Sequence, residues 1–254
     1  DFDTETSTYN VAVGYNAGIA VTTGFQNTLI GGLAGDALTD SDKNVAVGYA
    51  ALTAETLGQF NVALGRSALQ AQNNTTATDV YNVAVGYNAG SSVTTGIFNT
   101  ITGGLAADAL TVGERNTVYG KSALTSDTKG SRAVAIGLSA LATQNFTTAT
   151  DNYNVAVGYS AGGLVTTGVK NTLLGGLAGD ALTDADHNVA MGFGALSSDT
   201  LGSRSTALGD SALVSQNFTT ATDVYNVAVG YFAGGSITTG QNNTLIGGQA
   251  GDAL

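Results

Sequence analysis

Short apolar runs closed by glycine recur at a fixed spacing along the whole chain. Residues 10–14 read Asn-Val-Ala-Val-Gly, and the same letters return at Asn82, Asn154 and Asn226. Weaker copies begin at Asn27, Asn44, Asn61, Asn99, Asn116, Ala133, Asn171, Asn188, Ser205 and Asn243. The fourteen units have lengths of 17, 17, 17 and 21 residues, which repeat as a superrepeat of 72 residues. This regularity predicts a solenoid, in which each unit buries its apolar face only against its neighbours.

Two positions never vary when the residues of each unit are counted from its leading residue. Position 5 is glycine and position 8 is alanine in all fourteen units. Positions 2 to 4 are short β-type runs, so we expect one short strand per unit with apolar residues toward both faces. Glycine at position 5 permits the positive φ or the close backbone approach of a corner. The clearest copies of these structural positions are Gly14, Ala17, Gly86, Ala89, Gly158, Ala161, Gly230 and Ala233.

A second strand and a second corner are expected later in each unit. Position 13 is threonine in every complete 17-residue unit, and position 15 is usually glycine, as in Gly24 and Gly96. Two strands and two corners account for the unit length, so the pattern predicts a flat coil of two facing sheets. The leading Asn is present in twelve of the fourteen units. Stacked amides can hydrogen-bond along the axis of such an array, which favours a structural role for this column.

The fold predicted from these patterns is an all-β parallel β-roll solenoid of fourteen turns. We interpret residues 10–254 as a single repeat domain that is open at both ends, and residues 1–9 as the end of a preceding turn. A roll with alanine at a fixed interior position encloses little volume, and each buried methylene contributes only ~0.8 kcal/mol. A strand that is apolar on both faces needs a second surface, and symmetric association of identical chains is the usual solution. We therefore expect a homo-oligomer of parallel chains.

Composition narrows the possible partners. The chain of 254 residues has 8 Lys and Arg against 19 Asp and Glu, a net charge of −11, which disfavours nonspecific binding to nucleic acid or to an anionic membrane. No apolar run approaches the ~18 residues of a membrane span, so membrane insertion is not expected. The absence of cysteine excludes disulfides, thiolate metal sites and Cys nucleophiles. Glycine is abundant, but proline is absent and no Gly-X-Y period appears, which excludes collagen.

The repeat resembles those of known surface fibres. The sequence Asn-Val-Ala-Val-Gly-Tyr-x-Ala-Gly, followed by Thr-Thr-Gly and Asn-Thr-Leu-Ile-Gly-Gly-x-Ala-Gly, is similar to head repeats of trimeric autotransporter adhesins, and still more to repeats of bacteriophage tail fibres. The resemblance spans residues 10–254 and implies a left-handed parallel β-roll, a rigid parallel homotrimer and attachment to a host surface. The longer turn and the 21-residue fourth unit depart from the commonest adhesin form.

The extra residues of the fourth units predict loops that project from one edge. These loops lie within residues 72–79, 144–151 and 216–223, and two of them carry a Phe that we expect at an exposed tip. Polar loops with an aromatic tip suit weak, multivalent contact with a host glycan or protein, but packing of the Phe residues against a neighbouring chain is the simpler account. The candidate contact residues are Asn74, Thr75, Asp79, Phe146, Thr147, Asp151, Phe218, Thr219 and Asp223.

Other candidate chemistry is weak. The single histidine, His187, occupies a last position that holds Lys or Arg in other units, so a polar corner is the simpler interpretation. Asp184 and Asp186 have the spacing of a glycosidase pair, but another copy of this corner has Val112 and Glu114. The motif ending at Asp36 approximates a calcium nonapeptide, but its copies lie 72 residues apart, not in tandem. We expect no catalytic residue, no metal site and no cofactor.

These observations predict a structural and adhesive fibre segment without catalysis. The partners would be two further copies of the chain and a glycan or protein of a host cell surface, and the location would be a virion surface or an extracellular or cell-surface one. A phage tail-fibre shaft is the preferred hypothesis, and the head of a bacterial trimeric adhesin is the alternative. An ice-binding solenoid is a further alternative, because the position-13 threonines form a regular row.

Overall fold

The predicted all-β parallel solenoid is confirmed. A computed structural model describes residues 7–253 and shows about 14 turns with a repeat of about 17 residues. Contacts divide the chain into two compact units, Asp1–Ser122 and Ala123–Leu254. Residues 1–6 of the predicted preceding turn lie outside the described residues. Tyr9 has a φ of 51°, and Thr8 accepts a 2.6 Å hydrogen bond from the Gln26 N–H.

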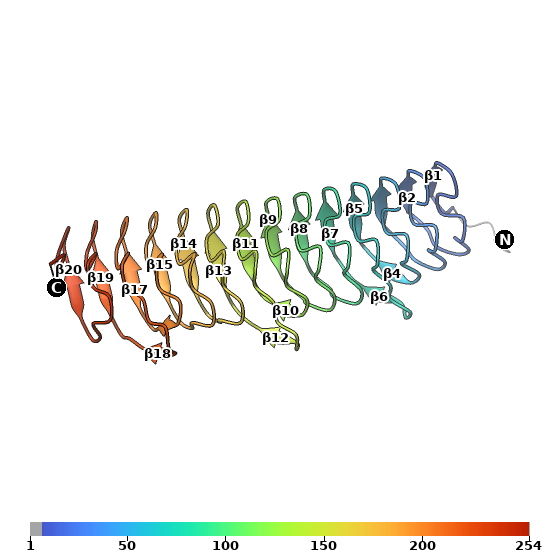
Figure 1. Ribbon diagram of the computed structural model, residues 1–254. Coiled ribbons are helices and arrows are strands. Elements are labelled where there is room, and N and C mark those ends of the chain that lie inside the picture. Colours follow the sequence, from blue (N-terminus) through green and yellow to red (C-terminus); the bar gives the residue numbers. More distant parts are fainter. Residues whose placement is uncertain (1–6, 254) are drawn as a thin grey trace. The chain divides into compact units, whose positions relative to one another are not determined.

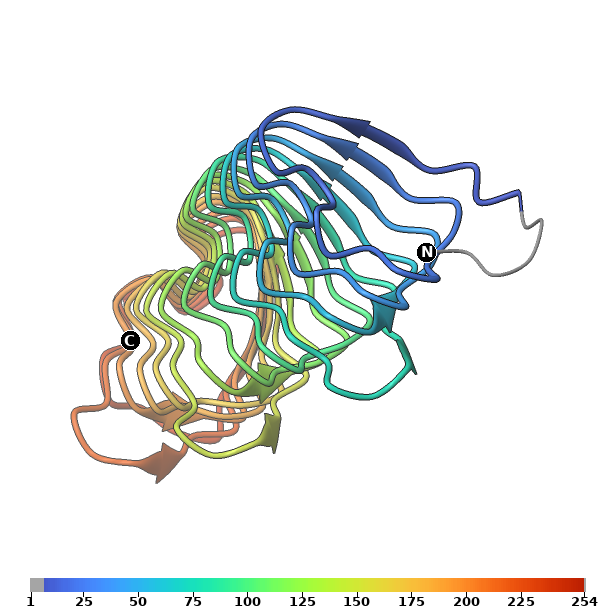
Figure 2. The same cartoon turned by 90° about the vertical axis from the view of Figure 1, so that its right-hand side faces the viewer.

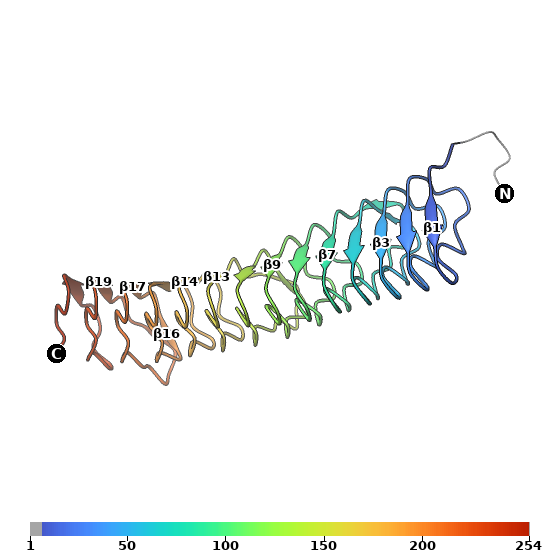
Figure 3. The same cartoon turned by 90° about the horizontal axis from the view of Figure 1, so that it is seen from above.

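One three-residue strand per turn forms a parallel ladder in each unit (Figures 1 and 3). The strands of the first unit are β1 (Val11–Val13), β2 (Thr28–Ile30), β3 (Val45–Val47), β5 (Val62–Leu64), β7 (Val83–Val85), β8 (Thr100–Thr102) and β9 (Thr117–Tyr119). Those of the second unit are β11 (Val134–Ile136), β13 (Val155–Val157), β14 (Thr172–Leu174), β15 (Val189–Met191), β17 (Thr206–Leu208), β19 (Val227–Val229) and β20 (Thr244–Ile246).

The register places equal positions of successive turns opposite each other. Ala84 of β7, for example, pairs with Ile101 of β8. From β2 to β19, the middle residue of each ladder strand points inward and is buried, while the two residues beside it point outward and are mostly half-buried. The sequence predicts that the inner face fills the roll and that the outer face needs a second surface. The strands cover only the inner face with their own chain, because side chains alternate along a strand and one roll has one interior.

The corner at position 5 is confirmed. These glycines have φ values between 126° and 142°, a region that other residues rarely adopt. A Cβ atom on Gly86 would lie 2.6 Å from the carbonyl oxygen of Gly103 in the next turn. The invariant alanine closes the corner, since the Ala89 N–H donates to the Gly86 carbonyl oxygen at 3.3 Å and the side chain is fully buried. A larger residue at position 8 would not fit the narrow interior.

The second corner lies elsewhere than predicted. Gly24 and Gly96, at position 15, do not have positive φ. Their missing side chains serve close packing, because a Cβ on Gly24 would lie 2.4 Å from the Ser41 carbonyl oxygen. The corner residue is the last one of each turn, and it adopts positive φ without being glycine. In the first unit these residues are Gln26, Lys43, Phe60, Tyr81, Phe98 and Arg115, with φ between 53° and 61°.

The predicted second sheet is largely wrong. Within residues 7–253, this wall of the coil has strands only beside the long loops, and each of these strands is two residues long. They pair as β4 (Gly58–Gln59) with β6 (Thr78–Asp79), β10 (Gly130–Ser131) with β12 (Thr150–Asp151), and β16 (Gly202–Ser203) with β18 (Thr222–Asp223). Elsewhere this wall consists of bends that bond from turn to turn, as from the Thr22 N–H to the Thr39 carbonyl oxygen. Figure 2 shows the turns of each unit nested, with the loops of β6, β12 and β18 extending outward.

The leading Asn residues form a buried column, as the sequence indicated. The side-chain oxygen of Asn82 accepts the backbone N–H of Asn99 at 2.8 Å, and its side-chain nitrogen donates to the Gly96 carbonyl oxygen at 2.7 Å. Each amide therefore joins its own turn to the next. Ala133 has no side-chain oxygen, and Asn152 supplies one instead by accepting the Asn154 N–H at 2.9 Å. The amide that is missing at the start of this turn is thus replaced near its end.

Candidate binding surface

The long loops expose their threonines and bury their aromatic residues. Thr75, Thr147 and Thr219 are exposed, and so are Asp79, Asp151 and Asp223. Asn74, Phe146 and Phe218 are only 6%, 5% and 6% exposed. The expectation of an aromatic loop tip is therefore wrong, since both Phe side chains pack into their own chain at the loop base. What remains for contact is Thr-Thr-Ala-Thr-Asp, which has the same sequence in all three loops.

A buried carboxylate holds the base of each loop. In the second unit, Asp127 Oδ1 accepts the N–H groups of Gly130 at 2.9 Å and Phe146 at 3.1 Å, while Oδ2 accepts Gln144 Nε2 at 2.6 Å. Gln144 Oε1 in turn accepts Asn154 Nδ2 at 2.9 Å. Burial raises the pKa of Asp127, and its hydrogen bonds act against that rise. The chain of acid, Gln and Asn thus joins three consecutive turns.

The same arrangement recurs at the other two loops. Glu55 accepts Gln72 Nε2 at 2.8 Å and the Asn74 N–H at 2.9 Å, and Asp199 accepts Gln216 Nε2 at 2.6 Å. Sequence reasoning missed this network. The signal was at position 12, where the first two units of each superrepeat have apolar residues and the next two have an acid and then Gln. An acid and an amide in a column of core residues indicate a buried pair, because unpaired burial is costly.

Ion pairs fix the outer end of two loops. Arg132 Nε lies 3.2 Å from Asp151 Oδ1, and Arg204 Nε lies 2.8 Å from Asp223 Oδ1. The hydrogen bond to Asp223 is the main cause of the raised pKa of Arg204. In the remaining loop, Phe60 occupies the position of the preceding turn that Arg132 and Arg204 hold beside the other two loops. Asp79 therefore has an aromatic residue, not an arginine, at this position. Such exposed pairs contribute little to stability, typically 0 to ~1 kcal/mol, but they orient the loop carboxylates.

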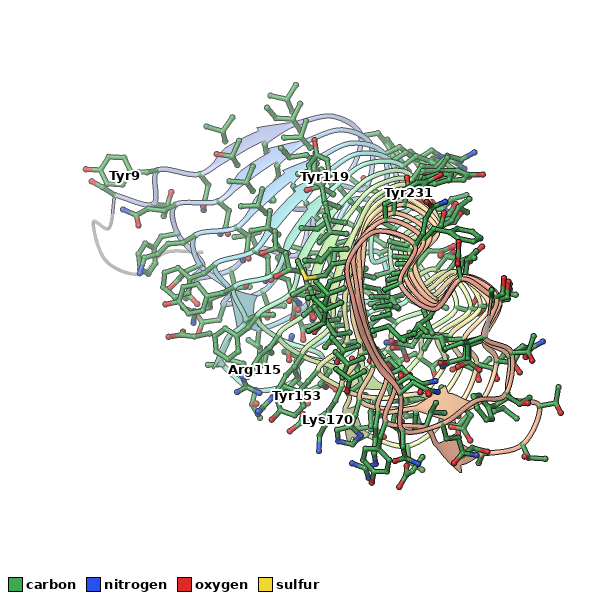
Figure 4. The ribbon with its side chains drawn as sticks, turned by 90° about the vertical axis from the view of Figure 1, so that its left-hand side faces the viewer. Tyr9, Arg115, Tyr119, Tyr153, Lys170 and Tyr231 are labelled. Atoms are coloured by element: carbon green, nitrogen blue, oxygen red, sulfur yellow. The ribbon has the colours of Figure 1, made fainter. Side chains whose placement is uncertain are left out.

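The corner column of last residues stacks cations on aromatic rings. In the first unit the ring of Tyr81 lies 4.8 Å from that of Phe60 and 6.0 Å from that of Phe98, measured between centroids. Lys43 and Arg115 cover the two ends of this stack. In the second unit, Tyr153 and Lys170 belong to the equivalent column, and both lie at one edge of that unit (Figure 4). Because the stacked faces cover one another, the three rings of the first unit offer edges and not platforms for a sugar.

The outward face of the strand ladder exposes apolar side chains along each unit. It combines positions 2 and 4 of the strands with an aromatic residue at position 6 in many turns. Tyr49 is 54% exposed and Phe193 is 58% exposed, and each ring lies against the glycine of the preceding turn. Tyr231, which belongs to the same row, points outward in Figure 4. A contiguous exposed apolar surface often marks a site of protein–protein interaction, which makes this face the candidate interface.

The remaining candidates of the sequence take part in contacts between turns. Asp184 Oδ1 accepts Thr167 Oγ1 at 2.6 Å, and Asp186 Oδ1 accepts the Val169 N–H at 2.7 Å. The threonine row at position 13 donates its hydroxyls to carbonyl oxygens of the next turn, as from Thr183 to Thr200 at 3.0 Å. Among residues 7–253 no group of three or more His, Cys, Asp or Glu is placed to hold a metal ion.

No protein-family model matches the chain, and no curated protein matches it either. The likeness to fibre repeats therefore rests on the repeat motif itself. In the part of the chain that the structure describes, no helix is long and apolar enough to cross a membrane.

Proposed function

We propose that the chain is a non-catalytic segment of an extracellular attachment fibre, and most specifically of a phage tail-fibre shaft on the virion surface. The support is the resemblance of the repeat, together with a fold in which hydrogen bonds run from turn to turn. In this proposal three parallel copies associate through the outward strand face. The loops, which extend from the turns, would meet a host glycan or protein.

The observation that carries the proposal is the apolar outer face of a regular strand ladder. Positions 2 and 4 repeat in register through each unit, so that a second copy in parallel meets the same pattern at every turn. A strand face of Val, Ile, Leu and Tyr exposed to water is unfavourable by about 25 cal/mol for each Å² of apolar area. Burial against identical chains removes this cost, and cyclic symmetry closes the assembly.

The assembly is tested by placing charge on that face. Val83 and Val155 are outward residues of β7 and β13, and both are half-buried in the single chain. We expect the unchanged chain to sediment near three times its mass of 25.2 kDa, and the double variant Val83→Asp with Val155→Asp to lose that species. Analytical ultracentrifugation at micromolar concentration measures both.

The matched control is Thr76→Asp with Thr148→Asp, which adds the same charges on exposed loops. It should keep the trimer. A stable, soluble monomer of the unchanged chain would contradict the assembly, and equal loss of assembly in the loop control would show that charge in general is responsible.

Contact through the loops is tested separately. We expect Thr→Ala substitutions at Thr75, Thr147 and Thr219 to weaken attachment to host cells at least tenfold when three loops and three chains act together. The melting temperature should stay within about 1–2 °C, because exposed substitutions rarely change stability by more than ~0.5 kcal/mol. Cell-binding assays and thermal unfolding of the same preparations measure the two effects. Undiminished attachment would exclude these threonines as the contact.

Two alternative functions need separate tests. The head of a bacterial trimeric adhesin would use the same fold and the same face, and the genes beside this one would separate the two hypotheses. The ice-binding alternative is not favoured, because the hydroxyls of the position-13 row donate within the stack, as Thr39 does to Thr56 at 3.1 Å. A thermal hysteresis measurement tests it directly.

A further inference from the structure

A hollow of about 350 Å³ opens on the second unit. Three consecutive turns line it, with Leu164 and Leu177 as apolar walls and Asp180 at one side. Ser139, Ala142, Thr143, Ser160 and Gly163 complete the lining. The Thr143 hydroxyl is already used, since it lies 3.0 Å from the carbonyl oxygens of Gly163 and Val165. Small ligands bind in concave, mostly apolar sites of this size with a few polar groups.

The hollow exists because two side chains are small. Gly163 has no side chain, and Ser160 is too short to cover it. The equivalent pair one superrepeat later is Gly235 and Phe232, and there the aromatic ring occupies the space, since a Cβ on Gly235 would lie 2.3 Å from it. Ser160 and Phe232 have nearly the same φ, 48° and 53°. The backbone therefore accepts either residue, and the sequence leaves this copy open.

One carboxylate oxygen of Asp180, a residue that lines the hollow, has no partner within the described chain. Asp180 Oδ1 is buried and receives no hydrogen bond. At the equivalent place in the first unit, Asp36 Oδ1 accepts the hydroxyl of Thr53. Ser197 takes the place of that threonine beside Asp180, and no bond forms between them. Burial raises the pKa of Asp180. The Asp180 carboxylate lines the hollow beside Leu164 and Leu177, and a carboxylate between apolar walls suits a ligand that brings both a donor and an apolar face.

We propose that this hollow binds one saccharide ring of a surface glycan, with a hydroxyl or ammonium donor on Asp180 and the apolar ring face against Leu164 and Leu177. The inference rests on the proposed attachment function and names its ligand class at a site other than the exposed loop threonines. One ring per chain binds weakly, and three parallel copies present three such sites to a branched or repeating glycan, where avidity raises the total.

The probes are D-glucosamine and D-glucose, titrated into the assembled chain and followed by methyl resonances of Leu164 and Leu177. We expect saturable shifts confined to these residues, with a Kd on the order of 1 to 10 mM, and tighter binding of glucosamine because its ammonium makes a charge-assisted bond. Asp180→Ala should weaken glucosamine binding at least tenfold. Ser160→Phe, which copies the residue found at position 232, should abolish the binding of both sugars with an unchanged melting temperature.

The matched control is Asp184→Ala, which removes a nearby exposed carboxylate outside the hollow and should leave the titration unchanged. Absence of saturable shifts, or equal shifts in the Ser160→Phe variant, would overturn the proposal. Equal binding of butylamine, which has the ammonium without the ring, would overturn the saccharide assignment. If the unchanged chain binds the sugars but the Asp180→Ala variant still attaches to host cells, the hollow does not contribute to attachment. The proposed function of the loops would then stand without it.

Discussion

Gly86→Val is expected to destabilise the first unit by about 3 kcal/mol or more, through backbone strain and a steric clash together. A β-branched residue at a φ of 139° is strained, and strain at such positions costs of order 1–3 kcal/mol. The added Cβ would also lie 2.6 Å from the Gly103 carbonyl oxygen and 2.7 Å from its carbon, which are backbone atoms of the next turn. The turn cannot yield without breaking the register of its neighbours. Denaturant unfolding at a fixed oligomeric state measures the effect.

Gly104→Ala provides the control, because it lies next to the same corner but is free of both constraints. Its Cβ would have only the Tyr87 carbonyl oxygen nearby, at 4.0 Å. Neighbouring turns carry Tyr87 and Lys121 at this position. We expect a change within ~0.5 kcal/mol. An unchanged midpoint for Gly86→Val would show that the corner is not where the structure places it.

The second large effect is expected from Asp127→Asn. The new amide keeps the bonds from Gly130 and Phe146, but its nitrogen then faces Gln144 Nε2, where the atoms are now 2.6 Å apart. Two donors cannot pair, and rotating the Gln amide only moves the conflict to Asn154. A buried unsatisfied group costs about 1–3 kcal/mol, and we expect a loss of that size in thermal or denaturant unfolding.

Exchange of the two groups tests the assignment. In the double variant Asp127→Asn with Gln144→Glu, the new carboxylate at position 144 can accept a side-chain N–H from the new amide at position 127 and another from Asn154. Every donor of the network then has an acceptor again, so most of the stability should return. A double variant as unstable as the single one would contradict the network.

The pH dependence has a defined sign. Because burial raises the pKa of Asp127 above its ordinary value of 3.8, the folded chain binds the proton more tightly than the unfolded chain. The contribution of this group to stability is therefore fully present below pH 3.8 and is lost as the pH rises through the folded pKa. Asp127→Asn should remove this part of the pH dependence, which thermal unfolding across the acidic range measures.

The sequence predicted those features that recur at every turn. The strand triplets, the glycine corner and the Asn column follow from identical letters at equal spacing, since a parallel in-register stack places equal positions together. The corner at Lys43 and Arg115 could not be predicted in this way. A long, charged side chain at positive φ contradicts local preference, and the bonds between turns impose it.

The candidate loops were harder to interpret because burial depends on the neighbouring turn. Phe146 stands between polar residues in the sequence, which favours a solvent-exposed tip. In the structure its N–H bonds to the buried Asp127, and this bond draws the ring into the interior. The hollow beside Asp180 was also not predictable, since it depends on what Ser160 and Gly163 lack.

The acid and amide network has a consequence for how such an array can change length during evolution. An Asp or Glu in the third turn needs the Gln of the fourth turn beside it, whereas the first two turns have apolar residues at position 12. If a deletion or duplication in the gene placed the third turn beside a first or second turn, the carboxylate of the third turn would be buried against Val or Leu. First and second turns can be gained or lost singly, but the third and fourth can be inherited only as a pair.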